Sequence, residues 1–399
     1  MKTADWIVVG GGFAGAALGY ELAKAGFSVV VLEQQANPLN ATRYSYGGIS
    51  YWSATTDLMR LISQEGIELH RTLSAELEAD TQFRELDLLL TIAPDADPKA
   101  IAASYAGCAI PPVLITAETA RELEPLLDPR AIAAALHGRH GHVDPELITA
   151  AYLQAMQRLG GTIEIAQVIG FTKTGDRPLE ESALHRVTGV LTTQETYSAS
   201  HVVVCAGGLS RVLLQAADIP VRCYFTRAEL VETPPLEIRL QTIVTAADLK
   251  RFQLEAIAGQ PETDALWNTP NHEIAPPILD AGAIQFLDGR VRMGQISRVL
   301  TDHTAVVDAA QSESDIRAAV GQVLPKLQHV PGSWGSCLVA FSGDGLPLIG
   351  ALPHIEGVHI FSGFSSPFAV LPPLARRFAH FLTGQPDDIM AQFSPARFS

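Results

Sequence analysis

The sequence has few cysteines, an excess of negative charge and no long hydrophobic run. Its four cysteines, Cys108, Cys205, Cys223 and Cys337, are far apart and form no CxxC pair, which argues against a disulfide framework, a zinc site or an iron–sulfur cluster. The formal net charge is −15. Because phosphate groups are bound by basic surfaces, nucleic acid and anionic membranes are poor partners. No apolar stretch approaches the roughly 20 residues that cross a bilayer, so we expect no transmembrane segment.

The composition is that of a globular protein. The chain has 399 residues, of which 47% are hydrophobic and 18% charged, enough for a large core and two or three domains. Ala14-Gly15-Ala16 resembles a signal-peptide cleavage site. The early acidic Asp5 argues against that interpretation, and the same residues fit another pattern better. We therefore expect a cytoplasmic protein.

That other pattern is the stretch "WIVVGGGFAGAALGYELAKAGFSVVVLEQ" at residues 6–34. Residues 6–9 form an apolar run typical of a buried parallel strand. A helical stretch then extends to residue 25, with Gly26 suited to its C-terminal cap. Residues 28–32 form a second, β-branched strand that ends at Glu33. The order of strand, glycines, helix, strand and acid predicts a dinucleotide-binding unit.

Each part of such a unit has a physical role. Gly10, Gly12 and Gly15 have GxGxxG spacing: the first permits a tight turn, the second lets backbone approach a pyrophosphate, and the third lets the helix pack on the strand. The helix N-terminus offers N–H groups and a positive dipole end to phosphates. Glu33 lies 18 residues after Gly15, where it can accept hydrogen bonds from ribose hydroxyls. An acid there argues against a 2′-phosphate and hence against NADP.

The glycines alone fit FAD and NAD equally, but two further features favour FAD. The sequence contains no second GxGxxG, which an enzyme that also used NADPH through a second dinucleotide domain should contain. The loop "NATRYSYGGISYW" after Glu33 is rich in hydroxyl groups and glycine. Such a loop can wrap a diphosphate and approach an isoalloxazine ring, although an ordinary polar loop has the same composition.

The sequence predicts secondary structure in three later segments. Residues 201–210 predict a buried strand that runs into a glycine-containing turn. Asp144 and Pro145 are suited to the N-cap and first position of a helix that ends near Gly160. Residues 358–361 predict a strand, and Gly363 opens a loop. Pro372-Pro373 is suited to a helix start, and the apolar face of that helix is predicted to contain Leu374, Phe378, Phe381 and Leu382.

Taken together, these segments resemble the D-amino-acid oxidase-like superfamily of flavoproteins, which contains glycine oxidase and sarcosine oxidase. The resemblance is strongest at residues 6–49, 141–168, 201–210 and 342–382. It implies an α/β fold with FAD bound extended, its adenosine end at residues 10–33. It also implies a Rossmann-type FAD-binding domain and a second domain built on a mixed, largely antiparallel β-sheet. We expect the discontinuous FAD-binding domain at residues 1–75, 141–215 and 335–399, and the substrate domain at 76–140 and 216–334.

The FAD-contacting residues expected from the glycine-rich unit, the loop after it and the resemblance form one set. They are Gly10, Gly12, Phe13, Ala14, Gly15, Glu33, Gln34, Thr42, Ser45, Gly47, Gly48, Ile49, Val168, Ala206, Gly207, Gly343, Asp344, Gly363, Phe364, Ser365, Ser366, Pro367 and Phe368.

A β-hairpin is predicted at residues 283–294. Asp288-Gly289 is a favoured two-residue turn. That turn places four residues on one face, Ile284, Phe286, Val291 and Met293, and four on the other, Gln285, Leu287, Arg290 and Arg292. A sheet with one polar face is suited to cover a substrate above the flavin, or that face simply meets water.

The stretch "SCLVAFSGDGLPLIG" at residues 336–350 lacks an arginine that the resemblance implies. In glycine oxidase-like members an arginine ahead of the Asp-Gly turn binds the substrate carboxylate, because its planar fork matches a carboxylate. Counting back from Asp344, that position is Val339. Three explanations remain: another arginine substitutes, the substrate has no carboxylate, or the chain has lost this chemistry. Substrate-binding candidates are Arg292, Arg298, Tyr51, Trp52 and Tyr224, with Arg222 and Arg227 as further cations.

Cys337 lies seven residues before Asp344. In sarcosine oxidase-like members a cysteine at this spacing is joined to the flavin, so Cys337 is a candidate for covalent attachment. The residues around it match that subfamily poorly, and cysteine is also a common small buried hydrophobe.

We expect the cofactor to supply the chemistry. A substrate C–H next to nitrogen transfers a hydride to flavin N5, and oxygen or a quinone is the final electron acceptor. The substrate is expected to be a small amine or amino acid. The alternatives are oxidation of a 2-hydroxy acid or other alcohol, an aromatic hydroxylase, from whose Gly-Asp-Ala-x-His motif "GDGLP" departs, and a flavoprotein without amino-acid oxidase activity. No residue is identified as a catalytic base, the clustered His137, His140 and His142 are interpreted as structural, and no metal site is expected.

Overall fold

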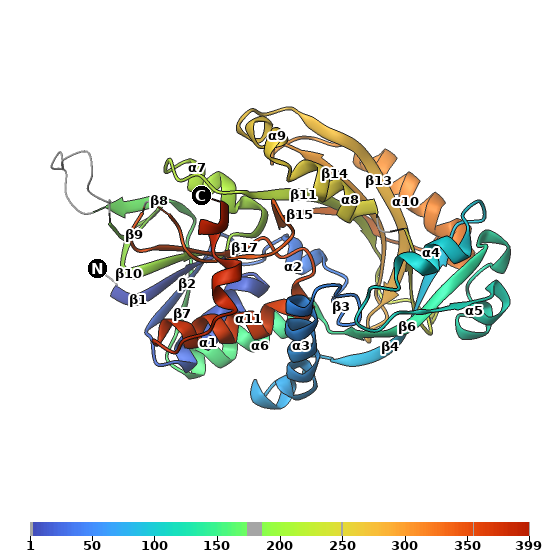
Figure 1. Cartoon of the computed structure of the whole chain (residues 1–399), viewed down its shortest axis with the longest axis horizontal. Coiled ribbons are helices and arrows are strands. Elements are labelled where there is room, and N and C mark those ends of the chain that lie inside the picture. The colour runs from blue at the N-terminus through green and yellow to red at the C-terminus, as the bar shows by residue number, and fades with distance from the viewer. Residues whose placement is uncertain (1–2, 174–185, 249, 354, 399) are drawn as a thin grey trace.

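The structure is a computed structural model that describes residues 3–173, 186–248, 250–353 and 355–398. It contains two β-sheets, here called sheet A and sheet B. In Figure 1 sheet A lies at the left with helices packed beneath it, and sheet B curves through the right half. Segments from the beginning, middle and end of the chain contribute to sheet A, so this part of the fold is discontinuous in sequence, as the resemblance implied.

Sheet A is mostly parallel. Its path runs β16 (Leu348–Ala351), β17 (Val358–Ser362), β10 (Thr196–Val204), β1 (Thr3–Val9), β2 (Val29–Glu33) and β7 (Thr162–Ile165). Off this path, β9 (Val187–Thr192) pairs with β10, and β8 (Val168–Lys173) pairs with β9. Along β1, Trp6 and Val8 belong to the core on one face, whereas Ile7 and Val9 belong to the core on the other. Both faces are covered, which explains why β1 and β2 read as continuous apolar runs.

The core beneath sheet A is made by helices α1 (Phe13–Lys24), α3 (Asp57–Glu76), α6 (Pro145–Arg158) and α11 (Pro367–Leu382). The predicted start of α6 is confirmed: the Asp144 side chain accepts hydrogen bonds from the backbone N–H groups of Glu146 and Leu147. The shorter helices around sheet A are α2 (Ala41–Tyr44) and α7 (Ser210–Gln215), with 3-10 turns at Gly207–Leu209, Met390–Phe393 and Pro395–Phe398.

Sheet B is mixed and largely antiparallel, as expected. Its path runs β15 (Ser333–Ser342), β11 (Cys223–Glu232), β14 (Val291–Leu300), β13 (Glu273–Gln285), β12 (Ile243–Ala246), β4 (Arg84–Ile92), β6 (Ala134–His142) and β3 (Gly48–Ile49), with β5 (Val113–Ile115) paired to β6. Among the described residues of sheet B, only the pairing of β12 with β4 is parallel. The expected domain boundary at residue 335 falls inside β15, and residues 48–49 also pair into sheet B.

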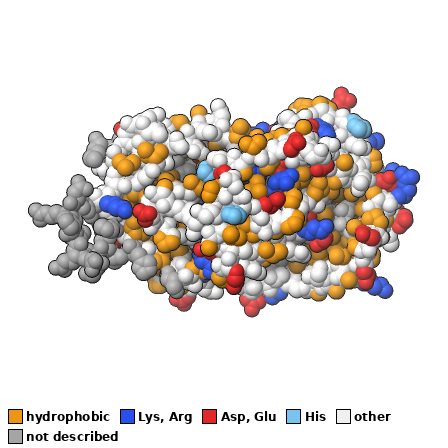
Figure 2. All heavy atoms as spheres, turned by 90° about the horizontal axis from the view of Figure 1, so that it is seen from above, with side chains coloured by type: hydrophobic (Ala, Val, Ile, Leu, Met, Phe, Trp, Pro, Cys, Tyr) orange, Lys and Arg blue, Asp and Glu red, His pale blue; other side chains and the backbone are white. Residues whose placement is uncertain are grey.

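Helix α10 (Ala309–Val323) packs on one face of sheet B through Ile316 and Val320. The remaining helices of this half are α4 (Pro98–Ser104), α5 (Ala117–Leu123), α8 (Lys250–Ala258) and α9 (Pro261–Asp264), with 3-10 turns at Pro129–Ala131, Ala265–Asn268 and Pro325–Leu327. On the face shown in Figure 2, acidic and basic side chains are interspersed with hydrophobic ones, so the negative excess is not gathered into one patch there. Among the described residues, no helix combines the length and apolarity needed to cross a bilayer.

The predicted two-residue turn of the β13–β14 hairpin is wrong by one residue. The Phe286 N–H donates to the Arg290 carbonyl over 2.8 Å, so Leu287, Asp288 and Gly289 form a three-residue loop. Gly289 has φ +93°, the left-handed conformation that such a loop requires. Ile284 therefore pairs with Arg292, and Val291 with Gln285. Because a one-residue slip exchanges the two faces of a strand, Arg290 and Arg292 join the face of Phe286.

The predicted start of the last helix is also wrong. Helix α11 begins at Pro367, and Pro372 and Pro373 lie inside it. Pro372 has no N–H for the Phe368 carbonyl, and the His70 Nε2 of α3 donates to this carbonyl instead over 2.7 Å. Gly66 of α3 lies against the Ala369 carbonyl, where a Cβ would come within 1.8 Å of the oxygen. Helix α3 thus donates to one of the two carbonyls that the prolines leave open and packs closely on the other. Phe381 of the predicted apolar face is exposed.

Candidate cofactor and substrate site

One cavity of about 540 Å³ lies between the two sheets. We call its two ends the turn end and the roof end. The turn end is lined by Gly10, Gly12, Glu33, Ala166 and Val168. The roof end is lined by Tyr44, Tyr46, His140, Arg251, Gln295, Cys337 and residues 363–368.

The turn end is shaped by backbone packed too closely for side chains. Gly10 has φ +110°, and a Cβ there would lie 2.6 Å from the Cys205 carbonyl oxygen. A Cβ on Gly15 would lie 1.8 Å from the Gly10 carbonyl oxygen. Both distances are far below van der Waals contact, so only glycine allows β1, α1 and β10 to approach one another here.

Glu33 at the end of β2 is held by backbone N–H groups. One carboxylate oxygen accepts from the Gly11 N–H at 2.8 Å and the other from the Gln35 N–H at 3.1 Å. A carboxylate oxygen has a second lone pair, so each can still accept from a hydroxyl group in the cavity. Thr42 Oγ1 accepts from the Phe13 N–H at 2.9 Å, which ties the loop after β2 to the first turn of α1.

That loop reaches the roof end through α2. The Asn40 side chain caps α2 by accepting from the Arg43 N–H at 3.0 Å, and the chain then turns at Gly47, with φ +68°. The Ser45 carbonyl accepts a hydrogen bond from Arg292 Nη1 of sheet B. Tyr44 and Tyr46 on either side of Ser45 both line the cavity. The anchored carbonyl therefore fixes the distance between this loop and the roof.

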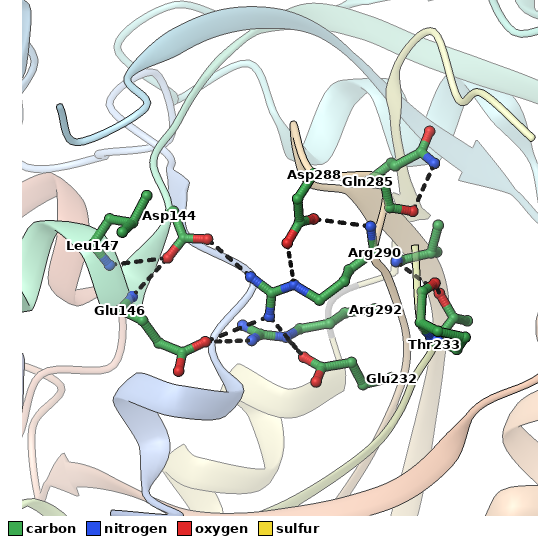
Figure 3. A network of polar contacts seen from close by, with 12 residues as sticks. Asp144, Glu146, Leu147, Glu232, Thr233, Gln285, Asp288, Arg290 and Arg292 are labelled. Carbon is green, nitrogen blue, oxygen red and sulfur yellow. Dashed lines mark hydrogen bonds and ion pairs between the residues drawn. The ribbon is translucent and has the colours of Figure 1, made fainter. Parts of the chain in front are cut away.

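Arg292 belongs to a network of ion pairs between the two halves of the fold (Figure 3). Its side chain is fully buried, and its Nε donates to Glu232 Oε2 at 2.7 Å. Glu232 also receives both terminal nitrogens of Arg43, at 2.9 and 2.6 Å. Burial alone would raise the pKa of Glu232, but the hydrogen bonds and charges of Arg43 and Arg292 outweigh it and lower the pKa to about 2. Glu232 is thus ionised at neutral pH.

Arg290 extends the same network to helix α6 (Figure 3). Its guanidinium contacts Asp144 at 3.1 Å, Glu146 at 3.4 Å and Asp288 at 2.5 Å. Asp144 is also the N-cap of α6. One carboxylate therefore both starts a helix of the sheet A half and holds an arginine of the sheet B half.

His140 on β6 presents a hydrogen-bond donor at the roof end. Trp52 Nε1 lies 3.0 Å from His140 Nδ1. Indole can only donate, so Nδ1 is the acceptor and the neutral imidazole carries its proton on Nε2. Burial lowers the pKa of His140 to about 4, which keeps the ring neutral at pH 7. Nε2 lies beside Gly48, where a Cβ would come within 2.7 Å of it.

Arg251 on α8 lies in the same part of the wall. Its Nε donates to Glu255 Oε1 at 2.8 Å, and its Nη2 donates to the Ser365 carbonyl at 3.1 Å. Glu255 is buried and also accepts from Thr226 Oγ1 and Ser365 Oγ, at 3.1 and 2.9 Å.

The N-terminus of α11 opens toward the cavity. Residues 363–368 line it, and Gly363 has φ +80°. The first turn of a helix leaves N–H groups without intrahelical partners, and the Ser366 side chain caps none of them. The positive end of the helix dipole thus meets the roof end of the cavity.

Most of the residues expected to contact FAD line this cavity. They are Gly10, Gly12, Phe13, Ala14, Glu33, Gln34, Thr42, Ser45, Gly48, Val168, Ala206, Gly207, Gly363, Phe364, Ser365, Ser366, Pro367 and Phe368. The other five lie outside its lining. Gly15 and Gly47 pack on backbone, Ile49 is in the core, and Gly343 packs on Gly259. Asp344 is held by Arg397 at 2.8 Å.

The five substrate-binding candidates lie elsewhere than in the lining. Arg292 is used in the ion-pair network, and Arg298 Nε donates to Glu229 at 2.6 Å. Tyr51 contacts Glu85 at 3.4 Å, and Trp52 lies behind His140. The Tyr224 hydroxyl donates to Asp264 at 2.6 Å. Val339 does line the cavity, so the position where the resemblance implies an arginine faces the site without one.

Several lining residues were not identified from the sequence. Tyr44 and Tyr46 flank Ser45 in the loop quoted for the diphosphate, and that adjacency was an available signal. Arg251 and Glu255 have the i,i+4 spacing of a helical ion pair, a pattern that usually marks a solvated helix face. His140 lies in the histidine cluster interpreted as structural.

Comparison with known proteins agrees with this geometry. An uncharacterized oxidoreductase, YurR, of Bacillus subtilis (strain 168) is 23% identical over 98% of both chains. The crystal structure of glycine oxidase from Geobacillus kaustophilus superposes with a TM-score of 0.77 at 20% identity and covers 99% of this chain and 98% of its own. That of L-proline dehydrogenase from P. horikoshii superposes with a TM-score of 0.73 at 20% identity and covers 100% and 98%.

The family model of the DAO group, described as FAD-dependent oxidoreductases, matches residues 5–380. This span contains both sheets, apart from the first two residues of β1, and every residue named above in the cavity lining. The chain therefore belongs to the DAO family of FAD-dependent oxidoreductases.

Proposed function

We propose that this FAD-dependent oxidoreductase oxidises a C–N bond of a small amine or amino acid. The main support is the continuity of the cavity, which joins a dinucleotide-binding turn to a roof with a guanidinium, a neutral imidazole and a helix N-terminus in its wall. Glycine oxidase and L-proline dehydrogenase, whose structures are similar, have names that denote amino-acid substrates.

The residues of the cavity fit FAD. At the turn end, Glu33 has lone pairs for ribose hydroxyls, and Gly10 and Gly12 allow a diphosphate to approach backbone. Ala166 and Val168 give an apolar wall for adenine. The roof end would then hold the flavin ring, and the N-terminus of α11 would face its negatively polarised edge.

Bound FAD supplies a hydride acceptor for a substrate carbon next to nitrogen. The protein groups would orient the substrate and stabilise charge. The N–H groups at the start of α11 would stabilise negative charge on the cofactor. His140 stays neutral and donates from Nε2 to an acceptor in the cavity. An amine that binds in its neutral form requires no catalytic base.

We propose that FAD is bound without a covalent link to Cys337. The thiol lines the cavity, but burial raises its pKa to about 12 despite the nearby charges of Arg251, Arg292 and Arg227. The thiolate is the reactive form of cysteine, and little of it is present at pH 7. Acid precipitation should release FAD into the supernatant, and yellow colour retained in the pellet would contradict this expectation.

The function is tested by recording the visible flavin spectrum without oxygen while a panel of substrates is added. The panel contains glycine, sarcosine, D- and L-amino acids, simple amines and 2-hydroxy acids. We expect bleaching by at least one amine. Bleaching only by 2-hydroxy acids would establish the alcohol-oxidising alternative instead. No bleaching by any of them would favour a flavoprotein without amino-acid oxidase activity.

A further inference from the structure

The geometry points to Arg251 on α8 as the residue that binds the carboxylate of the substrate at the roof end. This inference rests on the proposed function and adds a substrate class to it: amines that also have a carboxylate.

Arg251 is in a fixed position at the cavity wall. Glu255 lies one helical turn after it on α8 and binds its Nε at 2.8 Å. The Arg251 side chain is 19% exposed and that of Glu255 is 6% exposed. A charge-assisted hydrogen bond to a buried carboxylate holds the guanidinium plane, so a ligand meets a preorganised group and loses little side-chain entropy on binding.

The second anchor of Arg251 is the loop before α11. Arg251 Nη2 donates to the Ser365 carbonyl, and the Ser365 hydroxyl returns to Glu255. These hydrogen bonds among Arg251, Ser365 and Glu255 place the guanidinium directly beside the segment that we propose faces the flavin ring. Within the described part of the chain, Arg251 Nη1 makes no hydrogen bond or ion pair. Guanidinium has five N–H donors, and those of Nη1 are available to a ligand.

The position of Arg251 also relates it to Val339. Thr226 pairs directly with Val339 across β11 and β15, and directly paired residues of antiparallel strands point to the same face. The Thr226 hydroxyl donates to the same Glu255 oxygen that holds Arg251. Thr226, the residue opposite Val339, therefore helps to hold Glu255 and, through it, Arg251. The guanidinium that we propose binds the carboxylate comes from α8 rather than from β15.

The surrounding charge favours an anion. The positive charges of Arg251, Arg292 and Arg227 all act to lower the pKa of Cys337, although burial outweighs them. Arg292 is paired with Glu232, and Arg251 is paired with Glu255. The hydrogen bonds of Arg227 go to neutral oxygens, the His303 carbonyl at 2.9 Å and the Ser336 hydroxyl at 3.4 Å. This stretch of wall thus has positive charge that an anionic ligand can meet.

Arg227 is the rival cation because it also lines the cavity. Its Nε is buried, with no hydrogen-bond partner among the described residues, and its contacts are with β15 and the loop at His303 rather than with residues 363–368. These contacts favour Arg251 as the group nearer the ring. An Arg227→Met variant tests the choice.

The experiment uses the FAD-loaded protein and follows the visible flavin spectrum, without turnover. Acetate and propionate are titrated against the uncharged acetamide and propionamide. We expect the carboxylates to perturb the spectrum of the unaltered protein and the amides to do so at least tenfold more weakly. Arg251→Gln should weaken carboxylate binding at least tenfold, and Arg251→Lys by less. Lys250→Gln is the matched control, because it removes the same charge from an exposed neighbour on α8 and should leave binding unchanged.

A double variant, Arg251→Gln with Glu255→Gln, covers the case in which the single variant fails to fold, since it leaves no unpaired buried carboxylate. Carboxylate binding that survives in either folded variant would overturn the inference, as would a loss seen in Arg227→Met alone. Bleaching of the flavin by amines without any carboxylate effect would overturn the role of Arg251 and leave the proposed function standing. Arg251-dependent carboxylate binding without bleaching by any amine would support the role of Arg251 and overturn the proposed function.

Discussion

The two ends of the cavity are held in place by different kinds of interaction. At the turn end, backbone packs on backbone, as in the contact of Gly15 with the Gly10 carbonyl. At the roof end, charged side chains from distant segments hold one another, as in the contact of Arg292 with Glu232 and the Ser45 carbonyl. Backbone packing tolerates no added atom, whereas an ion-pair network depends on keeping every charge partnered. The two ends should therefore fail in different ways.

The largest effect is expected at the turn end, from Gly15→Ala. The new Cβ would lie 1.8 Å from the Gly10 carbonyl oxygen, so β1 and α1 must move apart. We expect a loss of more than about 4 kcal/mol of unfolding free energy, together with loss of FAD, measured by denaturant unfolding and by the FAD-to-protein ratio.

Gly26→Ala is its control at the other end of α1. Gly26 has φ +95° but nothing within 4 Å of an added Cβ, so the cost is only the roughly 1–2 kcal/mol of a left-handed conformation. Equal losses in the two variants would contradict the view that close backbone packing determines the turn end.

At the roof end, Glu232→Gln should be the most damaging exchange. It leaves the fully buried Arg292 with only the more distant carboxylate of Glu146, at 3.7 Å. Breaking a buried pair from one side costs about 3 kcal/mol, which should appear in the unfolding free energy of the FAD-loaded protein. Glu313→Gln on α10 removes the half-exposed partner of Arg317 and should cost less than about 0.5 kcal/mol. Similar costs for the two would mean that the network in Figure 3 is no stronger than a surface pair.

The His70→Gln variant tests the support of α11 through pH. Burial lowers the pKa of His70 to about 4, whereas an unfolded histidine titrates near 6.5. Between these values the unfolded chain binds the extra proton, so this contribution to stability is complete above pH 6.5 and is lost as the pH falls toward 4. Glutamine can still donate to the Phe368 carbonyl but does not titrate.

The unfolding free energy of the unaltered protein should therefore fall from pH 7 to pH 5 by about 2 kcal/mol more than that of the variant. Glu232 adds little in this window, because its unfolded-state pKa of about 4.3 and its folded-state pKa of about 2 both lie below it. Equal pH dependence in the two proteins would show that His70 becomes protonated without unfolding.

The smallest effect is expected from Trp52→Phe. The loss of one hydrogen bond costs about 1 kcal/mol, but it also releases the tautomer of His140, whose Nδ1 no longer has a donor. Long-range proton–nitrogen spectra of labelled histidine should show the Nε2–H form alone in the unaltered protein and a mixture in the variant, with His140→Gln to assign the signal. An unchanged Nε2–H signal in the variant would remove Trp52 from this role.

The turn end could be predicted from the sequence because its determinants are local. The glycines, both strands and Glu33 lie within one stretch, and each element was identified at nearly its observed bounds. The roof end could not be predicted in this way, because its contacts join segments that are far apart in the sequence. Arg292 was proposed for the substrate because the sequence gives no sign of its pairing with Glu232, which lies 60 residues away. The error in the hairpin register came from the length of one loop, which Gly289 extends to three residues. Arg251 was overlooked because its contact with Ser365 spans 114 residues.

The order in which the chain is made has a consequence for the cofactor. The dinucleotide-binding turn is among the first segments to be synthesised, but β1 gains β10 as a neighbour only much later in the chain. Strand β17, which begins at Val358, then pairs with β10. The segment at 363–368 that closes the roof end follows directly. A nascent chain on the ribosome thus has the glycine-rich turn without the cavity that the turn serves. The cavity that fits FAD is therefore complete only after synthesis has passed Leu371.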